Sequence, residues 1–452
     1  MARFPGGRKA NFRWVMIPGN EPTRDGQYVG ITAFTRSNWL ALLDAMGRPD
    51  LADDEQLLSM IGRFMRAAEV NSMLHEWTMR YDADEVVERC AAARVPAATL
   101  GNGDLLPRFE QLVERDVFVE QPGAGFLRPR APFRLSAVPD RDLTPAPRWG
   151  EHGGDPIPPP RTSGPRAARP VGDRPLAGIS VLDFTAFWSG PCATAWLHAM
   201  GADVVKVESL QRPDGLRFSA AVKPRDDDRY YEQAALFHAT NLGKRGITLD
   251  LTQPDGIDLA HRLIEQADVV CENFTPRVME AFGLDEPAVR AIRPDVVYLR
   301  LPAFGLTGPW KDRPGFAQTM EQMTGMAWVT GYEGGPPIIP GGMVDPAVGI
   351  HAAIALVAAL DHRDRTGEGQ LVEMPMIEVA AAMTAEQVAE RSAYGVLLGR
   401  RGERGVYRCA PEGDDTERWI ALDVDADPLP PEDRAVWCET LSTADAVSEL
   451  LA

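Results

Sequence analysis

The amino-acid sequence predicts an α/β protein: a Rossmann-like, doubly wound parallel sheet domain with a smaller helical or α+β domain. Three observations support this fold class. After residue 176, short apolar segments of strand type alternate with segments of helical periodicity, which is typical of βαβ units. Before residue 140 the periodicity is mostly helical. Between the two parts lies a stretch rich in proline, glycine and arginine, which suits neither helix nor strand.

These changes of pattern divide the chain into four predicted parts. They are a small domain at 1–140, a linker at 141–175, a Rossmann-like large domain at 176–400 and an abbreviated second small domain at 401–452. The last part rests on a weak internal repeat, because RWIALDV within it is similar to QYVGITA in the first part. Chance similarity is the alternative explanation of this repeat.

The composition is that of a soluble globular protein, with 44% hydrophobic and 25% charged residues in a chain of 452. The longest apolar stretch, Ala347 to Leu360, contains His351 and is shorter than the roughly 20 residues of a membrane-spanning helix. We therefore expect a buried helix there and no membrane partner. No apolar segment follows the basic residues at the N-terminus, so the sequence predicts no secretory signal and a cytoplasmic protein.

Cysteine spacing and charge disfavour several kinds of site. The five cysteines include no C-x-x-C pair, which argues against a disulfide framework and a zinc site, so we expect no metal. A formal net charge of -18 argues against nucleic acid as a partner, because binding to phosphates needs clustered lysine and arginine. A local basic pocket for one anionic cofactor is still compatible with this charge.

Four apolar segments of the large domain are predicted strands: ISVLDF, DVVKVE, DVVCENF and VVYLRLPAF. The segments PCATAWLHAMG and GIDLAHRLIEQA are predicted helices. In doubly wound sheets, ligands bind beyond the carboxyl ends of the strands. The loops after Phe184, Glu208 and Phe274 are therefore the candidate walls of a ligand site.

The first of these loops joins a strand to a helix within FTAFWSGPCATAW. It lacks G-x-G-x-x-G, which disfavours a nicotinamide or flavin dinucleotide. Trp188 is suited to stack on a purine ring, and Ser189 with the following amides is suited to bind phosphate at the start of the helix. The alternative is that Phe187 and Trp188 only cover the edge of the sheet.

Lys244 and Arg245 precede another predicted strand. They are either solvated surface charges or, together with Lys206 and Arg212, partners for cofactor phosphates. The first alternative is the more common role for such a pair.

Asn273 and Phe274 follow the third predicted strand, in CENFTP. A polar amide followed by an aromatic ring suits recognition of adenine. Alternatively, Asn273 closes a turn ahead of Pro276.

Asp345 stands between a glycine-containing turn and a long apolar helix pattern, in GGMVDPAVG. As a structural element, Asp345 and Pro346 are an N-cap followed by proline at the first helical position. As a chemical group, a carboxylate kept ionised beside the positive end of a helix can act as a covalent nucleophile. The glycines of 331–342 let backbone amides approach a developing oxyanion, as acyl transfer requires, and a plain turn is the alternative.

Seven motifs between Leu176 and about Tyr394 resemble the class III, CaiB/BaiF-type, coenzyme A transferases in the family's order. They are PLAGISVLDFTAFWSGP, MGADVVKVE, GKRGITLDLTQPDG, ADVVCENFTPRVMEAFGL, FGLTGPW, GMVDPAVG and RTGEGQLVEMPM. The ordered set is far more specific than any one motif. The resemblance implies a CoA-transferase with coenzyme A as its substrate and acyl carrier.

By this resemblance Asp345 is the nucleophile, because it matches the aspartate of the family's D-x-x-x-G element. It attacks an acyl-CoA thioester to form an aspartyl anhydride. The CoA thiolate then takes the aspartate as a thioester, and an acceptor carboxylate completes the exchange. The implied partners are therefore an acyl-CoA and a carboxylate. The family's positions for CoA contacts match Ala186, Phe187, Trp188, Ser189, Leu249, Asn273 and Phe274.

Three positions depart from the family's pattern in the predicted phosphate site. Ser209 and Ala281 stand where arginine is common, and Thr252 stands where some members have lysine. The loss of these cations weakens phosphate binding unless Arg212, Lys244 or Arg277 substitutes.

Another departure concerns the chemistry. Phe316 and Ala317 stand where transferases have an aromatic residue plus an acid, and where the family's racemases have His-Asp. Without the histidine a racemase is disfavoured, and without the acid a transferase keeps its nucleophile but loses a neighbouring carboxylate. Glu321, one helical turn after Ala317, is a candidate to compensate.

The N-terminal region resembles the end of the same family, in AMGRPDLADD, LHEWTMRYDADEVVERCAAARVPAA and PAPRWGEHGGD. This order fits part of a tandem fusion of two transferase units, or a permuted arrangement. We expect a homodimer, and interlocked chains are one form of it, since family members form interlocked dimers. Three functions follow from the resemblance: a CoA-transferase, a non-catalytic or partner-dependent CoA-binding subunit, and an acyl-CoA lyase or racemase of the same fold.

Overall fold

The computed structural model describes residues 19–139, 144–151, 174–218, 229–331, 335–400, 404–410, 419–423 and 442. The chain forms two compact units. The larger comprises Phe12–Ala327 and Ile338–Leu398, and the smaller comprises Met1–Asn11, Trp328–Pro337 and Gly399–Ala452. The predicted boundaries at 140, 175 and 400 stay predictions. Most of the predicted linker and of the predicted domain 401–452 lies outside the described residues.

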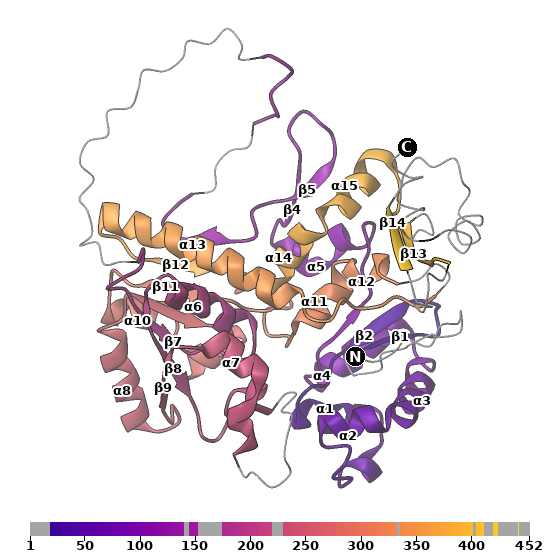
Figure 1. The fold of residues 1–452 in the computed structure, drawn as a ribbon, viewed down its shortest axis with the longest axis horizontal. Coiled ribbons are helices and arrows are strands. Elements are labelled where there is room, and N and C mark those ends of the chain that lie inside the picture. Colours follow the sequence, from indigo (N-terminus) through magenta and orange to yellow (C-terminus); the bar gives the residue numbers. More distant parts are fainter. Residues whose placement is uncertain are drawn as a thin grey trace. The chain divides into compact units, whose positions relative to one another are not determined.

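Among the described residues, seven strands of the larger unit form one sheet in the order β6-β12-β11-β10-β7-β8-β9 (Figure 1). The strands are β6 (Arg134–Leu135), β7 (Ser180–Asp183), β8 (Asp203–Glu208), β9 (Arg245–Thr248), β10 (Val269–Glu272), β11 (Val297–Arg300) and β12 (Gln370–Glu373). Neighbouring strands are parallel except for β6, which pairs antiparallel with β12. The prediction of a mixed α/β fold with a large, mostly parallel sheet is confirmed.

The strand order reverses between β7 and β10. The chain proceeds from β7 outward through β8 to β9, returns to β10, and proceeds the other way through β11 to β12. The loops that follow β7 and β10 therefore leave the sheet in opposite directions, although the two strands are hydrogen-bonded neighbours. A reversal of this kind opens a crevice at the carboxyl ends of the two strands.

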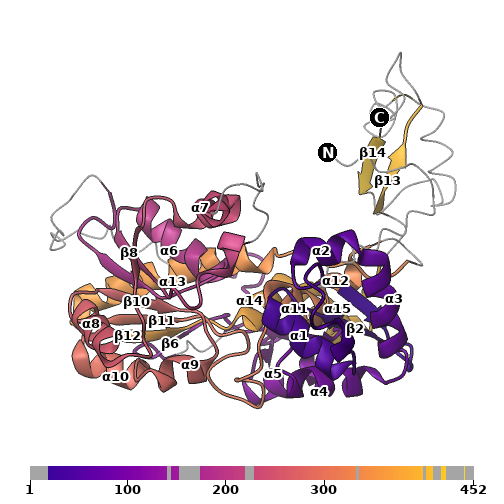
Figure 2. The same cartoon turned by 90° about the horizontal axis from the view of Figure 1, so that it is seen from below.

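Helices cover both faces of this sheet (Figure 2). Side chains alternate along each strand, so Val181 and Val269 point to one face while Leu182 and Val270 point to the other. The first face packs against α6 (Ser189–Ala199) and α13 (Val344–Thr366). The second packs against α8 (Pro254–Ile264), α9 (Pro276–Ala281) and α10 (Glu286–Ile292). Burial on both faces explains why these strands read as continuous apolar runs in the sequence.

Helix α13 is the long helix predicted from the apolar stretch. It is buried on the side that faces α6 and the sheet, whereas Ile350, Ile354 and Val357 on its other side are exposed. The prediction of a buried helix is thus correct for one side only. Within the described part of the chain, α13 is also the one helix with the length and composition to cross a membrane, a test that the core helices of soluble proteins pass as well.

The region before residue 100 forms a small sheet with its own helical core. Strands β1 (Gly19–Pro22), β2 (Tyr28–Ile31) and β3 (Ala97–Thr99) are antiparallel. The helices around them are α1 (Arg36–Ala45), α2 (Met60–Met65), α3 (Ala67–Thr78) and α4 (Ala83–Ala92). Their apolar faces bury Trp39, Leu42, Trp77 and Val86 in one cluster.

The segment from 106 to 135 connects this small sheet to the large one. It contains α5 (Glu110–Glu114), the antiparallel pair β4 (Phe118–Glu120) and β5 (Leu127–Pro129), and the edge strand β6. Gln111 donates from its side chain to the carbonyl oxygens of Phe304 at 2.7 Å and Thr307 at 2.8 Å. The region that precedes the predicted linker is therefore part of the larger unit and supplies one strand of its sheet.

The remaining described elements complete the chain. In the larger unit these are α7 (Ala235–Asn241), α11 (Ala317–Met323), α14 (Met376–Met383), α15 (Ala385–Tyr394) and short 3-10 helices at Pro49–Leu51, Leu106–Arg108, Gly215–Phe218 and Tyr230–Gln233. Helix α12 (Met326–Val329) spans a boundary of the two units. In the smaller unit β13 (Arg404–Arg408) and β14 (Trp419–Asp423) form an antiparallel pair.

We predict that Arg115 is essential for the stability of the larger unit. Its guanidinium is 1% exposed and contacts the carboxylates of Glu373 at 2.8 Å and Glu378 at 2.7 Å. Arg115→Met leaves both acids buried without this partner, so the free energy of unfolding should fall by about 3–5 kcal/mol. The measurement is urea unfolding followed by tryptophan fluorescence.

Arg108→Ala is the matched control. Arg108 pairs with Asp104 on the surface, and its side chain is 69% exposed. Its removal should change the free energy of unfolding by no more than about 0.5 kcal/mol. Similar losses for the two variants would contradict the assignment of stability to the buried ion pairs.

Candidate active site

The turn after β7 rests on a buried aspartate. The Asp183 carboxylate, at the end of β7, accepts hydrogen bonds from the Thr185 N–H at 3.0 Å and the Thr194 hydroxyl at 2.6 Å, and the Lys244 ammonium lies 3.1 Å away. Burial by itself raises the pKa of Asp183, but Lys244 and Lys206 hold that pKa below its usual value. Asp183 is therefore an ionised anchor beneath the turn.

The two lysines that were candidates for phosphate binding are internal. The Lys244 side chain is 1% exposed and also donates to the carbonyl of Pro191 at 3.0 Å. Lys206 is 3% exposed, pairs with Asp214 at 3.1 Å and donates to the carbonyl of Thr185 at 2.7 Å. The hypothesis that Lys244 and Lys206 meet cofactor phosphates is therefore wrong: both hold the turn from inside the protein.

Phe187, in the same turn, has a left-handed backbone with φ of 63°. A residue other than glycine pays about 1–3 kcal/mol for such a conformation. The Phe187 N–H donates to Asp214 at 3.1 Å, and its ring packs edge-on against Phe316 at 5.2 Å between centroids. Strain held in this way by surrounding contacts is typical of functional turns.

Asn273 joins the two loops that flank the strand-order reversal. Its side-chain oxygen accepts from the Ala186 N–H at 2.8 Å, and its side-chain nitrogen donates to the Ala186 carbonyl at 2.7 Å. The amide group is thus engaged by backbone. Asn273 positions the turn after β7, and its predicted contact with adenine competes with these two bonds.

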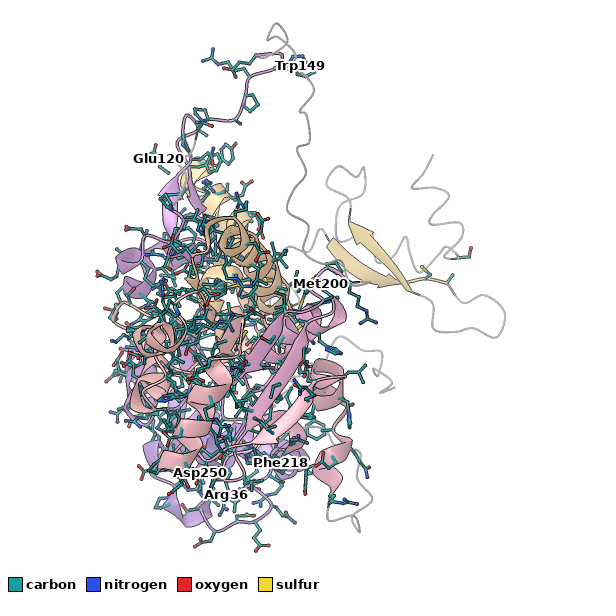
Figure 3. All side chains as sticks on the ribbon, turned by 90° about the vertical axis from the view of Figure 1, so that its left-hand side faces the viewer. Arg36, Glu120, Trp149, Met200, Phe218 and Asp250 are labelled. Carbon is teal, nitrogen blue, oxygen red and sulfur yellow. The ribbon has the colours of Figure 1, made fainter. Side chains whose placement is uncertain are left out.

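The structure places the seven predicted CoA-binding residues at the carboxyl ends of strands in the large sheet. Ala186, Phe187, Trp188 and Ser189 follow β7, Leu249 follows β9, and Asn273 and Phe274 follow β10. Ser189 is buried and the other six are half-buried. Asp250, just beyond β9, and Phe218, in the segment after β8, lie at the same end of the larger unit (Figure 3).

Asp345 is the second residue of α13 and does not cap it. The N-cap is Met343, and no side chain makes a capping hydrogen bond there, so the N-cap interpretation is wrong. Instead, the hydroxyl and the N–H of Ser189, the first residue of α6, donate to the Asp345 carboxylate. Two helix N-termini, each with a partial positive charge, therefore meet at one half-buried carboxylate.

Glu321 on α11 binds the glycine turn that leads into α13. Its buried carboxylate accepts from the N–H groups of Gly341 at 3.0 Å, Gly342 at 2.7 Å and Met343 at 2.6 Å. These amides are engaged by Glu321, which contradicts the hypothesis that they are free for an oxyanion. The sequence had indicated Glu321 only by its spacing from Ala317.

The pKa of Asp345 is strongly perturbed. Burial raises it from the usual 3.8 to about 7, the charge of Glu321 adds to this effect, and the hydrogen bonds from Ser189 oppose it. At neutral pH the carboxyl is therefore about half ionised. Perturbation of this size, caused by burial and a specific neighbouring charge, is a frequent property of functional carboxyls.

Phe316 and Ala317 take structural places. The Phe316 ring lies edge-on to Phe34 at 5.4 Å as well as to Phe187, so it links the N-terminal region to the turn after β7. Ala317 begins α11 and is fully buried. No acid stands at this position, as the sequence indicates.

The site contains no cluster suited to a metal within the described ranges. No group of three or more histidine, cysteine, aspartate or glutamate side chains is arranged to hold an ion among those residues. The described cysteines, Cys90, Cys192, Cys271 and Cys409, are free thiols.

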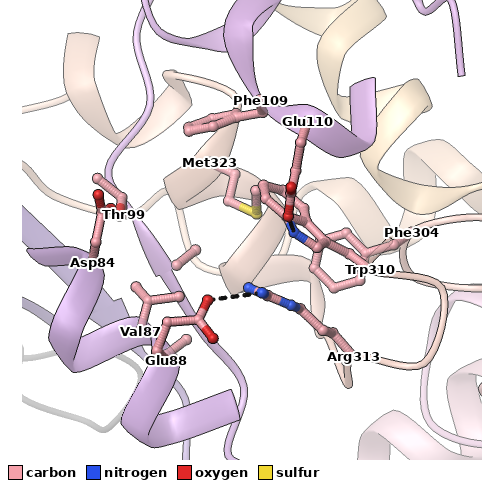
Figure 4. A pocket seen from close by; sticks show the side chains of 12 residues that line it. Asp84, Val87, Glu88, Thr99, Phe109, Glu110, Phe304, Trp310, Arg313 and Met323 are labelled. Carbon is pink, nitrogen blue, oxygen red and sulfur yellow. Dashed lines mark hydrogen bonds and ion pairs between the residues drawn. The ribbon is translucent and has the colours of Figure 1, made fainter. Parts of the chain in front are cut away.

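A cavity of about 270 Å³ lies elsewhere in the larger unit (Figure 4). Phe109, Phe304 and Trp310 supply its aromatic wall, and Arg313 lies over the Trp310 ring and pairs with Glu88 at 2.9 Å. None of the residues that line it is a predicted site residue. The cavity is thus separate from the surroundings of the candidate nucleophile.

Comparisons with known proteins identify the family and several relatives of this chain. A model of CoA-transferase family III matches residues 9–153 and 176–445. The succinate–glutarate CoA-transferase of Agrobacterium fabrum is 38% identical over 214 residues, which cover 47% of this chain and 54% of that protein. The beta subunit of the succinyl-CoA–L-malate CoA-transferase of Chloroflexus aurantiacus is 32% identical over 260 residues, which cover 56% and 63%.

Among solved structures, a CaiB/BaiF family protein from Brucella suis is similar over 51% of this chain and 60% of its own, with 35% identity and a TM-score of 0.47. The chain therefore spans between about half and two thirds of the length of these relatives. The family model, in contrast, matches it in two separate stretches.

We predict that Asp345→Asn stabilises the fold at neutral pH. The folded state raises the pKa of this carboxyl to about 7 from 3.8, so it binds an extra proton between these values and loses stability as the pH rises through them. Since the carboxyl is half-buried, the variant should gain about 1–2 kcal/mol at a pH of about 8, less than the full shift implies, and nothing at a pH of about 4. Urea unfolding at both pH values measures the difference.

Asp183→Asn should change the free energy of unfolding in the opposite direction. The pKa of Asp183 is lowered in the folded state by Lys244 and Lys206, so removing its charge should destabilise the protein at neutral pH. A loss of stability for Asp345→Asn at a pH of about 8 would contradict the raised pKa of Asp345.

Proposed function

Since the chain belongs to CoA-transferase family III, we propose that it transfers coenzyme A between an acyl-CoA thioester and a carboxylic acid, with Asp345 as the nucleophile. The observation that carries the proposal is the Asp345 carboxylate, half-buried between the N-termini of α6 and α13. Its position suits attack on an electrophilic carbonyl carbon. The same position stabilises negative charge that develops beside it.

The proposed reaction has four steps, and each breaks one bond and forms one. The Asp345 carboxylate attacks the acyl-CoA carbonyl carbon, and the C–S bond breaks to give an acyl-aspartyl anhydride and CoA thiolate. The thiolate then attacks the aspartyl carbonyl, releases the first carboxylic acid as its anion and leaves an aspartyl-CoA thioester. The acceptor carboxylate attacks this thioester and frees the thiolate again. The thiolate finally attacks the acceptor's acyl carbonyl, which releases the new acyl-CoA and restores Asp345.

The residues around Asp345 support these steps. The anhydride and thioester states remove the negative charge of Asp345, so its raised pKa, caused first by burial and then by Glu321, favours their formation. The Ser189 hydroxyl and N–H, which donate to the carboxylate at rest, are placed to donate to the oxyanion of each tetrahedral intermediate. The Trp188 ring lies against Gly342, where an added Cβ atom would be 3.2 Å from it, and so covers the turn that leads to Asp345.

We also propose a Rossmann-like, doubly wound sheet that holds coenzyme A at its strand-order reversal. The strand order and the helices on both faces support this description. Ala186 to Ser189, Leu249, Asn273 and Phe274 are then the contact residues, with the Trp188 ring available for stacking on adenine. The phosphates need cations, and Arg212 and Arg277 are exposed after β8 and β10.

A second candidate function is a CoA-binding subunit without turnover of its own. The absence of an acid at Ala317 and the serine and alanine at Ser209 and Ala281 favour it. The chain also spans only part of the length of its relatives. This candidate function therefore includes a partner in the cytoplasm, either a second copy of the chain in a homodimer or another protein chain. A racemase stays disfavoured because a phenylalanine ring, Phe316, stands where that chemistry needs a base.

Asp345→Asn should abolish CoA exchange and covalent trapping. The variant keeps the size of the side chain but removes the attacking carboxylate, so exchange of labelled CoA between succinyl-CoA and carboxylates should fall at least about 10³-fold. Hydroxylamine added during turnover should convert Asp345 to a hydroxamate that mass spectrometry of the peptide locates. Asp250→Asn is the control and should leave exchange unchanged, because this half-buried carboxylate just beyond β9 is bonded to the N–H and hydroxyl of Thr252.

Binding without exchange would support the second candidate. If calorimetry shows that the wild type binds CoA while neither exchange nor a hydroxamate appears with any of succinyl-, glutaryl- or formyl-CoA, the transferase proposal is rejected. A hydroxamate at another residue would assign the role of nucleophile to that residue and not to Asp345.

Charge reversal at Arg212 and Arg277 tests the phosphate site. Arg212→Glu and Arg277→Glu should each raise the KM for acyl-CoA about tenfold and leave kcat nearly unchanged, because the phosphates do not take part in the reaction. Arg262→Glu is the control. This exposed arginine lies in the last turn of α8, which leads into the amino end of β10 and not to the carboxyl ends of the strands. An equal rise in KM for all three variants would show only a general effect of charge.

A further inference from the structure

Glu321 has an environment that is unusual for a carboxylate. Its side chain is 0% exposed and lies in α11, a helix whose residues from Thr319 to Met323 are all buried. Burial of a carboxylate is costly unless donors compensate for the lost water. The donors here are successive backbone amides, and they belong to the turn that precedes Asp345.

The turn is built to present those amides. Gly341 and Gly342 have φ of 101° and 107°, a region that residues with a Cβ atom rarely adopt. Successive N–H groups in such a conformation point to one side and form a concave anion site. The Glu321 carboxylate occupies this site, and the N–H of Val344, the first residue of α13, also donates to it.

Two consequences for Asp345 follow from this contact. First, Asp345 comes directly after the amides that Glu321 binds, so the contact fixes where α13 begins and how its first turn is oriented. Second, the Glu321 carboxylate acts on the Asp345 carboxylate. Burial raises the pKa of Glu321 and its amide hydrogen bonds oppose this rise, and in its ionised form Glu321 raises the pKa of Asp345, because like charges disfavour each other.

We propose that Glu321 is the positioning residue of the nucleophile: its carboxylate fixes the Gly341–Met343 turn, and its negative charge makes the neighbouring Asp345 carboxylate a more reactive anion. This inference rests on the proposed transferase function. A carboxylate that is destabilised as a free anion gains more when it forms a neutral ester-like bond. This role needs the negative charge of an acid at residue 321, which an amide would not supply.

The other groups around Asp345 leave Glu321 as the charged neighbour that raises its pKa. From α6, Ser189 donates two hydrogen bonds, which oppose the rise, and Cys192 is a neutral thiol whose pKa burial raises further. From α13 itself, His351 is engaged through Nδ1 with the carbonyl of Ala347 at 2.8 Å. The Lys244 ammonium forms an ion pair with Asp183.

Glu321→Gln tests the proposal through the pH profile. Glutamine keeps the size and one acceptor oxygen but removes the charge. The pH at which kcat/KM for CoA exchange falls by half on the acid side should move down by about one unit, and kcat at its plateau should fall about 10- to 100-fold with little change in KM. A purely structural role predicts a lower kcat with an unmoved profile, and that result would overturn the electrostatic part of the proposal.

Glu378→Gln is the matched control. Glu378 is a buried carboxylate of the same unit, 1% exposed and paired with Arg115 at 2.7 Å. Its loss should lower thermal stability without moving the pH profile. If both variants move the profile equally, Glu321 has no specific role.

A direct titration separates this proposal from the proposed function. In protein labelled with ¹³C at the aspartate carboxyl carbons, the signal that Asp345→Asn removes should titrate near a pKa of about 7 in the wild type and at a lower pH in Glu321→Gln. An unchanged midpoint rejects the coupling, whether or not exchange is detected. A shifted midpoint in a protein that exchanges no CoA keeps the coupling and rejects the transferase function.

The coupling can also be measured from the other side if Glu321→Gln does not fold. Because the interaction is reciprocal, removing the charge of Asp345 must lower the pKa of Glu321 by the same cause. Glutamate labelled at its carboxyl carbon, compared between the wild type and Asp345→Asn, reports this change. An identical Glu321 titration in the two proteins would reject the proposal.

Discussion

The arrangement of the site depends on how closely α13 approaches α6. A Cβ atom at Gly349 would lie 2.8 Å from the side chain of Cys192, so the two helices can pack at this distance only with glycine there. The close approach brings the first residue of α6, Ser189, to the second residue of α13, Asp345. The positive ends of both helices then act on one carboxylate. A larger residue in the contact would separate them and leave Asp345 facing only its own helix.

The same type of side chain has opposite properties at two points of the site. Asp183 and Asp345 are both buried enough for desolvation to raise their pKa, but only Asp183 has ammonium groups against it. Asp183 therefore stays an anion and supports the turn, whereas Asp345 is held close to its titration point beside a second carboxylate. The lysines of this region are used in the support and are not exposed to a ligand. The protein thus uses its cations to stabilise the frame and leaves the candidate nucleophile less stable as an anion.

Much of the larger unit was predictable because its information is local. The apolar runs that became β7, β8, β10 and β11 are short, bounded by turn residues and separated by helical periodicity. The rule that ligands bind at carboxyl ends of strands then located Ala186 to Ser189 and Asn273. What the sequence could not show is how polar side chains find partners across the fold. For Lys244 the sequence offered a surface charge or a phosphate contact, and neither alternative showed its burial against Asp183, which joins segments far apart in the chain. Glu321 likewise had no local sign of its three amide donors.

The antiparallel edge strand has a consequence for how the chain reaches this fold. Leu135 pairs with Val372, so this edge of the sheet cannot form until most of the chain between them has been synthesised and has folded back. Contacts of such long sequence separation form slowly, since the intervening loop must close first. During translation, β6 therefore stays unpaired until β12 has been synthesised. Until the two strands pair, the edge of β12 is also open and can join another chain. Assembly in the right order, and not only final stability, is then a condition for obtaining the active geometry.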